Sequence, residues 1–70
     1  MSSRDQEVYD FVRKQVTLLR EGGDLKGDSI PVHYVNHIVE SYFLSHHVGI
    51  SEAYSLVLKA INEMGYRVTD

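Results

Sequence analysis

The chain turns at Ser45-His46-His47-Val48-Gly49-Ile50-Ser51, between two segments with helical periodicity. On both sides of this stretch, apolar side chains recur every three or four residues, which is the spacing of one face of an α-helix. The stretch itself breaks that pattern and contains a glycine, as short turns do. We therefore expect two consecutive helices that meet at a sharp corner.

The periodicity predicts three helices, over residues of about 4–21, 31–46 and 51–64. Ser3 and Gln6 have the spacing of a capping box, which opens a helix. Pro31 suits the first turn of the second helix, and Ser51 is expected to cap the third. Gly65 is expected in the left-handed position that closes the third helix.

These elements predict an all-α fold, a compact three-helix bundle in a single domain over residues 1–70. The glycine-rich residues 22–30 are expected to form a mobile connector. Residues 66–70 are expected to form either a short strand or an extended tail. A chain of this length buries only ~60% of the surface that its unfolded form exposes. Because it has no cysteine, disulfides cannot reinforce it, which leaves a metal or a second chain.

The third helix has more apolar surface than one neighbouring layer would cover. At 100° per residue, its apolar side chains spread over roughly 200° of the circumference. Such a helix is either central to the bundle or shared with another chain, and in a three-helix bundle we favour sharing, in a homodimer or higher homo-oligomer. The predicted partner or dimer interface comprises Tyr34, Leu44, Tyr54, Leu56 and Leu58.

Residues 35–66 loosely resemble the helix-turn-helix family. The matching features are a first helix, Gly49 in the turn, the pair Ile50-Ser51 and a following helix with Leu58 directed inward. Residues 61–68 also resemble the passage from a winged-helix recognition helix into its first wing strand. The resemblance implies a DNA-binding transcriptional regulator as an alternative function. The residues that would then contact DNA are Ser55, Lys59, Asn62 and Arg67, helped by Arg13 or Lys14.

The charge pattern disfavours nucleic acid as a partner. The net charge is −3, and residues 28–70 hold five acidic residues against only Lys59 and Arg67. Glu52 and Glu63 flank the face of the third helix that would approach DNA, where they would meet phosphates. Binding to another protein therefore remains the favoured kind of interaction.

Histidines form a stripe on the second helix. His33, His37 and Glu40 are spaced by four and three residues, which places them on one side of a continuous helix. Two imidazoles one turn apart can chelate zinc or nickel, and a second copy of the chain could complete the site. We favour a solvated polar face without a cofactor and keep metal binding as the second alternative. His46 points toward the apolar side and is expected to be a partly buried packing residue.

The sequence shows no features of catalysis or membrane insertion. It has no cysteine nucleophile, no serine elbow and no carboxylate pair on a defined scaffold, so we expect no catalytic residue and no enzyme. Its longest uninterrupted apolar run, Leu56-Val57-Leu58, is far shorter than a membrane span or a signal peptide core. We expect a soluble cytoplasmic protein: a small regulatory or adaptor protein that acts through protein–protein contacts.

Overall fold

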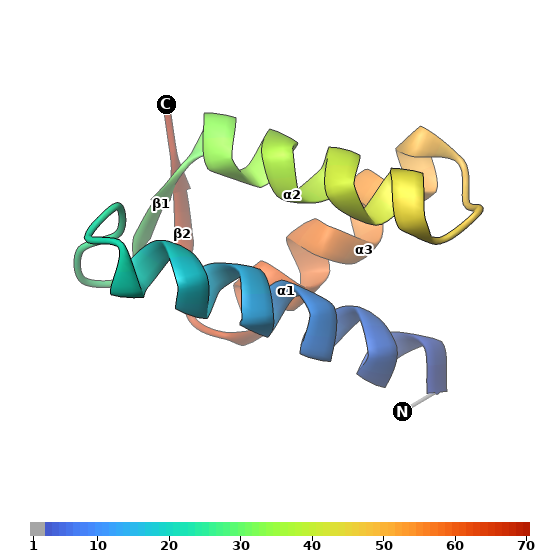
Figure 1. Ribbon diagram of the computed structural model, residues 1–70, viewed down its shortest axis with the longest axis horizontal. Helices are drawn as coiled ribbons and strands as arrows, with labels where there is room; N and C mark the ends of the chain where they lie inside the picture. The colour runs from blue at the N-terminus through green and yellow to red at the C-terminus, as the bar shows by residue number, and fades with distance from the viewer. Residues whose placement is uncertain (1–2) are drawn as a thin grey trace.

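Three helices and a small two-stranded sheet make up the protein (Figure 1). The computed structural model describes residues 3–70. The elements follow one another as α1 (Ser3–Glu21), β1 (Ser29–Pro31), α2 (Val32–Ser45), α3 (Ile50–Glu63) and β2 (Arg67–Thr69). The helix bounds differ by at most one residue from the expected ones. The fold is mostly helical, as predicted.

The prediction of an all-α fold is wrong in one respect, because β1 and β2 form a parallel sheet. Ile30 lies opposite Val68 at the centre of this pairing. The backbone N–H of Arg67 donates to the carbonyl oxygen of Asp28 at 2.7 Å, which extends the contact by one residue. Of the two alternatives for residues 66–70, the strand is therefore the one that forms.

The connector between α1 and α2 is part of the core rather than a free loop. Leu25 and Ile30 are both buried in it, and β1 ends the segment that we expected to be mobile. A three-residue strand that reads Ser-Ile-Pro has too few positions to show an alternating pattern. Pro31, the last residue of β1, is extended, with φ −62° and ψ 145°, and α2 starts at the next residue.

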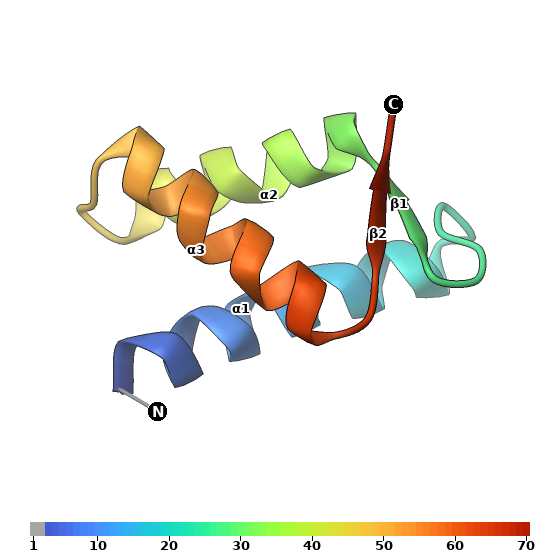
Figure 2. The same ribbon diagram turned by 180° about the vertical axis from the view of Figure 1, so that it is seen from behind.

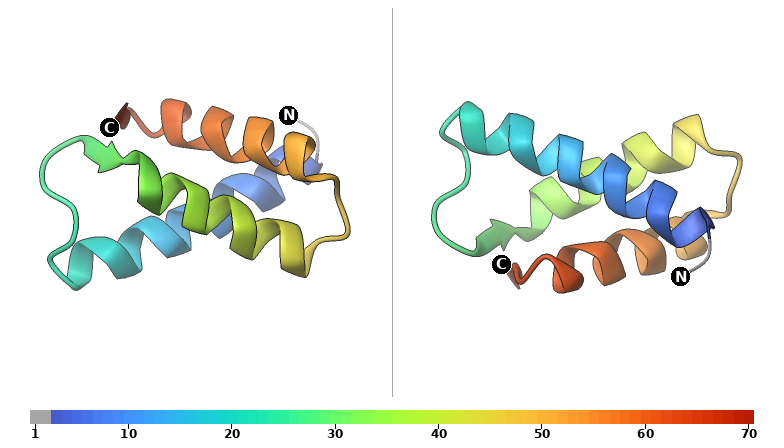
Figure 3. Two further views of the ribbon diagram at one scale, coloured as in Figure 1. Left: turned by 90° about the horizontal axis from the view of Figure 1, so that it is seen from above. Right: turned by 90° about the horizontal axis from the view of Figure 1, so that it is seen from below.

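α3 packs against both other helices, and Figure 2 shows it crossing in front of them (Figure 3 gives two further views). Its buried side chains are Ala53, Val57, Ala60 and Ile61. Leu56, Leu58 and Met64 are partly buried and pack against the same core. Most of the apolar surface that led us to expect sharing is therefore covered within the chain. Ile50 and Tyr54 remain exposed.

The helix ends differ from expectation in their caps. α3 begins at Ile50 with Gly49 as its N-cap residue, so Ser51 lies inside the helix and does not cap it. Gly49 is extended, with φ −67°, and the positive φ of the corner falls on His47 instead, at +21°. Gly65 has the expected left-handed conformation, with φ +84°.

At the start of α1, the capping role expected of Ser3 concerns a side chain outside the described part of the structure. Gln6 donates from Nε2 to Asp10 Oδ1 at 3.1 Å and so takes a partner further along the helix. None of the helices within residues 3–70 is long and apolar enough to cross a membrane.

Candidate functional site

The exposed side of α3 carries charges that are already paired with α1. Arg4 Nη1 lies 2.7 Å from Glu52 Oε1, and Lys59 Nζ lies 3.8 Å from Asp5 Oδ2. The two pairs attach the first turn of α3 and a position two turns further along it to the first turn of α1. A phosphate that approached Lys59 would have to compete with the carboxylate of Asp5.

The other residues predicted to contact DNA do not form a cationic surface. Ser55 and Asn62 are exposed on α3, as expected for a solvent face. Arg67 lies on β2 with its Nη2 at 3.8 Å from Asp28 Oδ1, so a carboxylate accompanies this cation too. All four predicted residues thus lie at the surface, but the two cations among them, Lys59 and Arg67, each lie beside a carboxylate.

The histidine stripe is exposed along the outer side of α2. His33, His37 and Glu40 all face solvent, and the ring of His33 lies against Tyr34 with centroids 4.2 Å apart. Across residues 3–70, no three histidine or acidic side chains gather in a way that could hold a metal ion. A site shared between two copies of the chain stays a prediction.

The five residues of the predicted interface divide into two groups. Leu44, at the end of α2, is 70% exposed, and Tyr54 is exposed on the first turn and a half of α3. Tyr34, Leu56 and Leu58 are partly buried against the core and offer only their edges. Only the first group presents broad apolar surface.

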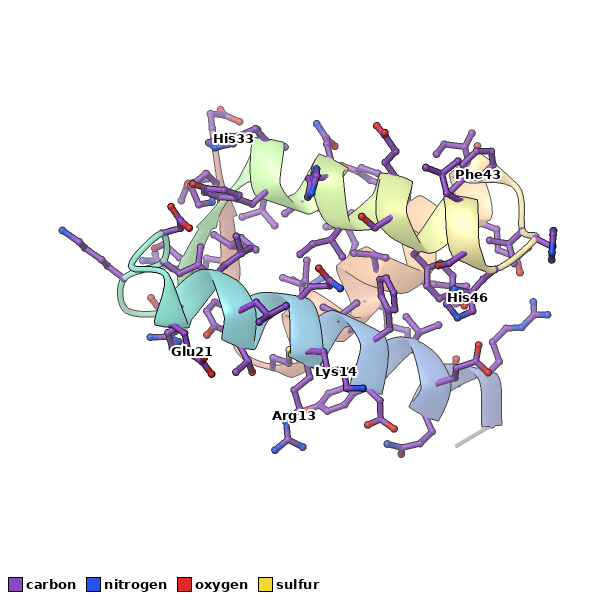
Figure 4. The ribbon with its side chains drawn as sticks, viewed as in Figure 1. Arg13, Lys14, Glu21, His33, Phe43 and His46 are labelled. Carbon is purple, nitrogen blue, oxygen red and sulfur yellow. The ribbon has the colours of Figure 1, made fainter. Side chains whose placement is uncertain are left out.

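Two exposed apolar residues were missed by sequence reasoning. Phe43, which was not among the predicted interface residues, is exposed on α2, and Figure 4 shows it beside the connection to α3. Ile50 was expected to precede α3, whereas it is the first residue of that helix and is 53% exposed. Phe43, Leu44, Ile50 and Tyr54, on the two sides of the α2–α3 connection, are named the corner surface below.

His46 and Tyr42 join α2 to α1 beneath this corner. His46 is partly buried, as predicted, and its ring meets the edge of Phe11 at a centroid distance of 5.4 Å. Its Nε2 lies 3.2 Å from Glu7 Oε1, and its Nδ1 lies 2.9 Å from Ser45 Oγ. Burial raises the pKa of the Tyr42 hydroxyl, and the negative charge of Glu7 raises that pKa further.

Compared with protein-family models, curated proteins and solved structures, the chain matches none of them. Its function must therefore be argued from its own surfaces.

The opposite end of the molecule is held by polar contacts between loops and helices. Arg20 donates from Nε to Tyr66 Oη at 3.1 Å and from Nη2 to the carbonyl oxygen of Gly27 at 2.6 Å. Tyr34 Oη donates to Asp24 Oδ1 at 3.2 Å, and its pKa is raised, first by burial and then by the charge of Asp24. These contacts hold the part of the connector that precedes β1 against α1 and α2.

Beside Arg20, the outer face of α1 is hollowed. An open groove of about 430 Å³ lies between α1 and the end of α3, lined by Tyr9, Arg13, Val16, Thr17, Arg20, Glu21, Met64 and Tyr66. A second, open region of about 650 Å³ is lined by α1 alone, shares Arg13 and Thr17 with the groove and extends to Lys14 and Leu18. Sequence reasoning considered this face only for Arg13 and Lys14, as residues that would help DNA binding. Only Leu18, an apolar residue outside the buried stripe, could have drawn attention to it.

Proposed function

We propose that this protein is a small, non-enzymatic regulatory or adaptor protein that acts through protein–protein contacts, and that the corner surface binds a second copy of the chain. The observation that carries the proposal is the corner surface itself. It places four large apolar side chains, Phe43, Leu44, Ile50 and Tyr54, at one end of the molecule.

The corner surface offers enough apolar area to support a weak or moderate dimer. Burying the exposed part of each of its four side chains would contribute roughly 1–2 kcal/mol. The two copies together would contribute roughly 8–16 kcal/mol, and association costs an estimated ~4–15 kcal/mol in lost rigid-body freedom, so much of this gain is offset. A reversible homodimer, formed around a two-fold axis, suits these magnitudes and would complete the small core of a 70-residue chain.

Charge favours a second copy over an unlike partner at this site. Within residues 41–54, which hold the corner surface, the only Asp, Glu, Lys or Arg is Glu52, and its carboxylate is paired with Arg4 at 2.7 Å, although 24% of the whole chain is charged. Two copies can therefore meet here without opposing fixed like charges, despite a net charge of −3 on each. An unlike partner selected by charge complementarity would find only the carboxylate of Glu52 here, which Arg4 already neutralises.

Sedimentation velocity over a range of protein concentrations tests the proposal. We expect the wild-type chain to dimerise reversibly and the Leu44→Asp variant to remain a monomer with unchanged helix content. Leu18→Asp makes the same change at an exposed leucine on α1 and should leave dimerisation intact. A wild-type chain that stays monomeric at the highest concentrations, or a Leu18→Asp variant as impaired as Leu44→Asp, would refute the proposal.

DNA binding is the second candidate function, supported by the presence of two adjoining helices with Ser55 and Asn62 exposed on the second. The carboxylates beside Lys59 and Arg67 weigh against it. Titration of the protein with a mixed-sequence DNA duplex at low salt tests this second candidate function. Binding that weakens steeply with salt would favour DNA, and no retention at the lowest salt would remove this candidate.

A further inference from the structure

The hollowed face of α1 combines cations with exposed apolar surface. Arg13 and Thr17 line both hollows, so the two hollows adjoin along the helix. Leu18 is 64% exposed in the larger one, and the ring of Tyr66 and the side chain of Met64 line the smaller one. Figure 4 shows Arg13 and Lys14 on the side of the molecule away from Phe43, so this face is separate from the corner surface.

The cations of this face are not neutralised within the described part of the chain. Neither Arg13 nor Lys14 forms an ion pair or a side-chain hydrogen bond there. The Asp10–Lys14 pair that their spacing favours is not formed, and Asp10 accepts from Gln6 instead. Among the described residues, Arg20 donates to the hydroxyl of Tyr66 and to a backbone carbonyl and lies 5.4 Å from the centroid of the Tyr66 ring, so no carboxylate is paired with it.

We propose that this face, defined by Arg13, Lys14, Leu18 and Arg20 and named the α1 groove, binds an acidic amphipathic peptide segment of a partner protein. Carboxylates of the peptide would pair with the two free cations, Arg13 and Lys14, which present charge-assisted hydrogen-bond donors. An apolar side chain of the peptide would cover Leu18. The proposal goes beyond self-association, because it gives the protein a second surface, for an unlike partner.

Charge distribution favours an acidic peptide over a nucleic acid. Asp10 and Glu21 also line the groove and interrupt its positive charge. A phosphate backbone needs a continuous cationic track, which these carboxylates break. A peptide can place its acidic side chains singly, opposite Arg13 and Lys14, and Leu18 offers an anchor that a phosphate backbone has no group to use.

Fluorescence anisotropy with a labelled helical peptide, glutamates on one face and leucines on the other, tests the proposal on the full chain. We expect saturable binding that weakens as salt is raised. The double variant Arg13→Gln/Lys14→Gln should bind roughly fivefold to tenfold more weakly, as expected for two solvent-exposed charge pairs. Lys26→Gln removes an exposed cation from the connector and is the matched control, with unchanged affinity.

Amide chemical-shift changes on peptide addition provide the second measurement. Shifts centred on residues 13–20 support the proposal, and Leu18→Ser should weaken binding without altering the helix content. Equal binding by the double variant and wild type, or shifts confined to the corner surface, would overturn it. Equal binding of a glutamine-for-glutamate peptide, or stronger binding of a DNA duplex to the same residues, would overturn it as well. Because none of these readouts depends on dimerisation, the outcome is independent of the corner surface.

Discussion

The imidazole ring of His46 lies stacked on the phenol ring of Tyr42, with centroids 4.2 Å apart and planes inclined by 15°. Phe11 of α1 meets both rings edge-on, at 5.3 Å from Tyr42 and 5.4 Å from His46. The three rings tie the end of α2 to α1 immediately below the corner surface. The orientation of that surface therefore depends on an aromatic cluster rather than on the connecting residues alone.

Replacement of His46 by alanine should lower the free energy of unfolding by roughly 0.5–1.5 kcal/mol, the range measured for aromatic ring pairs. The loss has a local cause, since the stacked contact with Tyr42 and the edge contact with Phe11 disappear together. Urea unfolding followed by circular dichroism measures it. His37→Ala, at an exposed position of the same helix, should change stability by less than about 0.5 kcal/mol.

The raised pKa of Tyr42 predicts a loss of stability at alkaline pH. Burial, and then the charge of Glu7, raise this pKa above its ordinary value of 10.0. The unfolded chain therefore loses the phenol proton first, so the contribution is present in full below pH 10 and is lost as pH rises through the folded-state pKa.

Unfolding measured at about pH 8 and about pH 11 tests this dependence. Tyr42→Phe keeps the ring and removes the ionisable group, so it should flatten the decrease. Tyr34→Phe should remove a smaller part of the alkaline decrease in stability, because the Tyr34 side chain is only partly buried. An equally steep decrease in the Tyr42→Phe variant would contradict the assignment.

Ile30 and Val68 are paired across the sheet but should respond differently to truncation. Ile30 is fully buried, so Ile30→Ala should cost roughly 2–5 kcal/mol, comparable with the whole stability expected of so short a chain. Val68 is 38% exposed, and Val68→Ala should cost about 1 kcal/mol or less. Thermal unfolding compares the two. Similar melting temperatures would mean that the connector lies outside the core.

Two glycines offer a matched test of backbone conformation. Gly65 has φ +84°, a region that costs other residues roughly 1–2 kcal/mol, so Gly65→Ala should destabilise the protein by about that amount. Gly49 has φ −67°, and no neighbouring atom lies within 4 Å of the position that an alanine methyl group would take there. Alanine is a poorer N-cap residue than glycine, but it also restricts the unfolded chain, and because these effects oppose each other Gly49→Ala should change stability by less than about 0.5 kcal/mol. Chemical denaturation of both variants distinguishes the two backbone conformations.

The helices could be predicted from sequence because their signals are local. The four-residue spacing of Val8, Val12 and Val16 is complete within α1, and these residues are buried. The sheet could not, because Ile30 and Val68 are far apart in the chain and each strand has only three residues. The two strands meet because α2 and α3, which lie between them in the chain, pack against each other. Neither strand carries a sequence pattern that would predict this pairing.

The candidate surfaces were predictable only in part, for a similar reason. Leu44 and Tyr54 were expected at an interface and are exposed, but Phe43 and Ile50 depend on where α2 ends and α3 begins. The freedom of Arg13 and Lys14 could not be inferred from spacing, because Asp10 lies close enough in sequence to pair with Lys14 and takes another partner. The choice between competing side-chain partners follows from three-dimensional geometry.

Because β1 precedes α2 and β2 follows α3, the small sheet connects these two helices at the end opposite their loop. One end of the pair is joined by the connection at His46–Gly49, and the other by hydrogen bonds between β1 and β2 (Figure 1). Neither helix can swing away from its partner without breaking the sheet or the central core. A partner at the corner surface therefore meets apolar side chains held in fixed relative positions, and binding loses less conformational entropy than it would at a hinged helix pair.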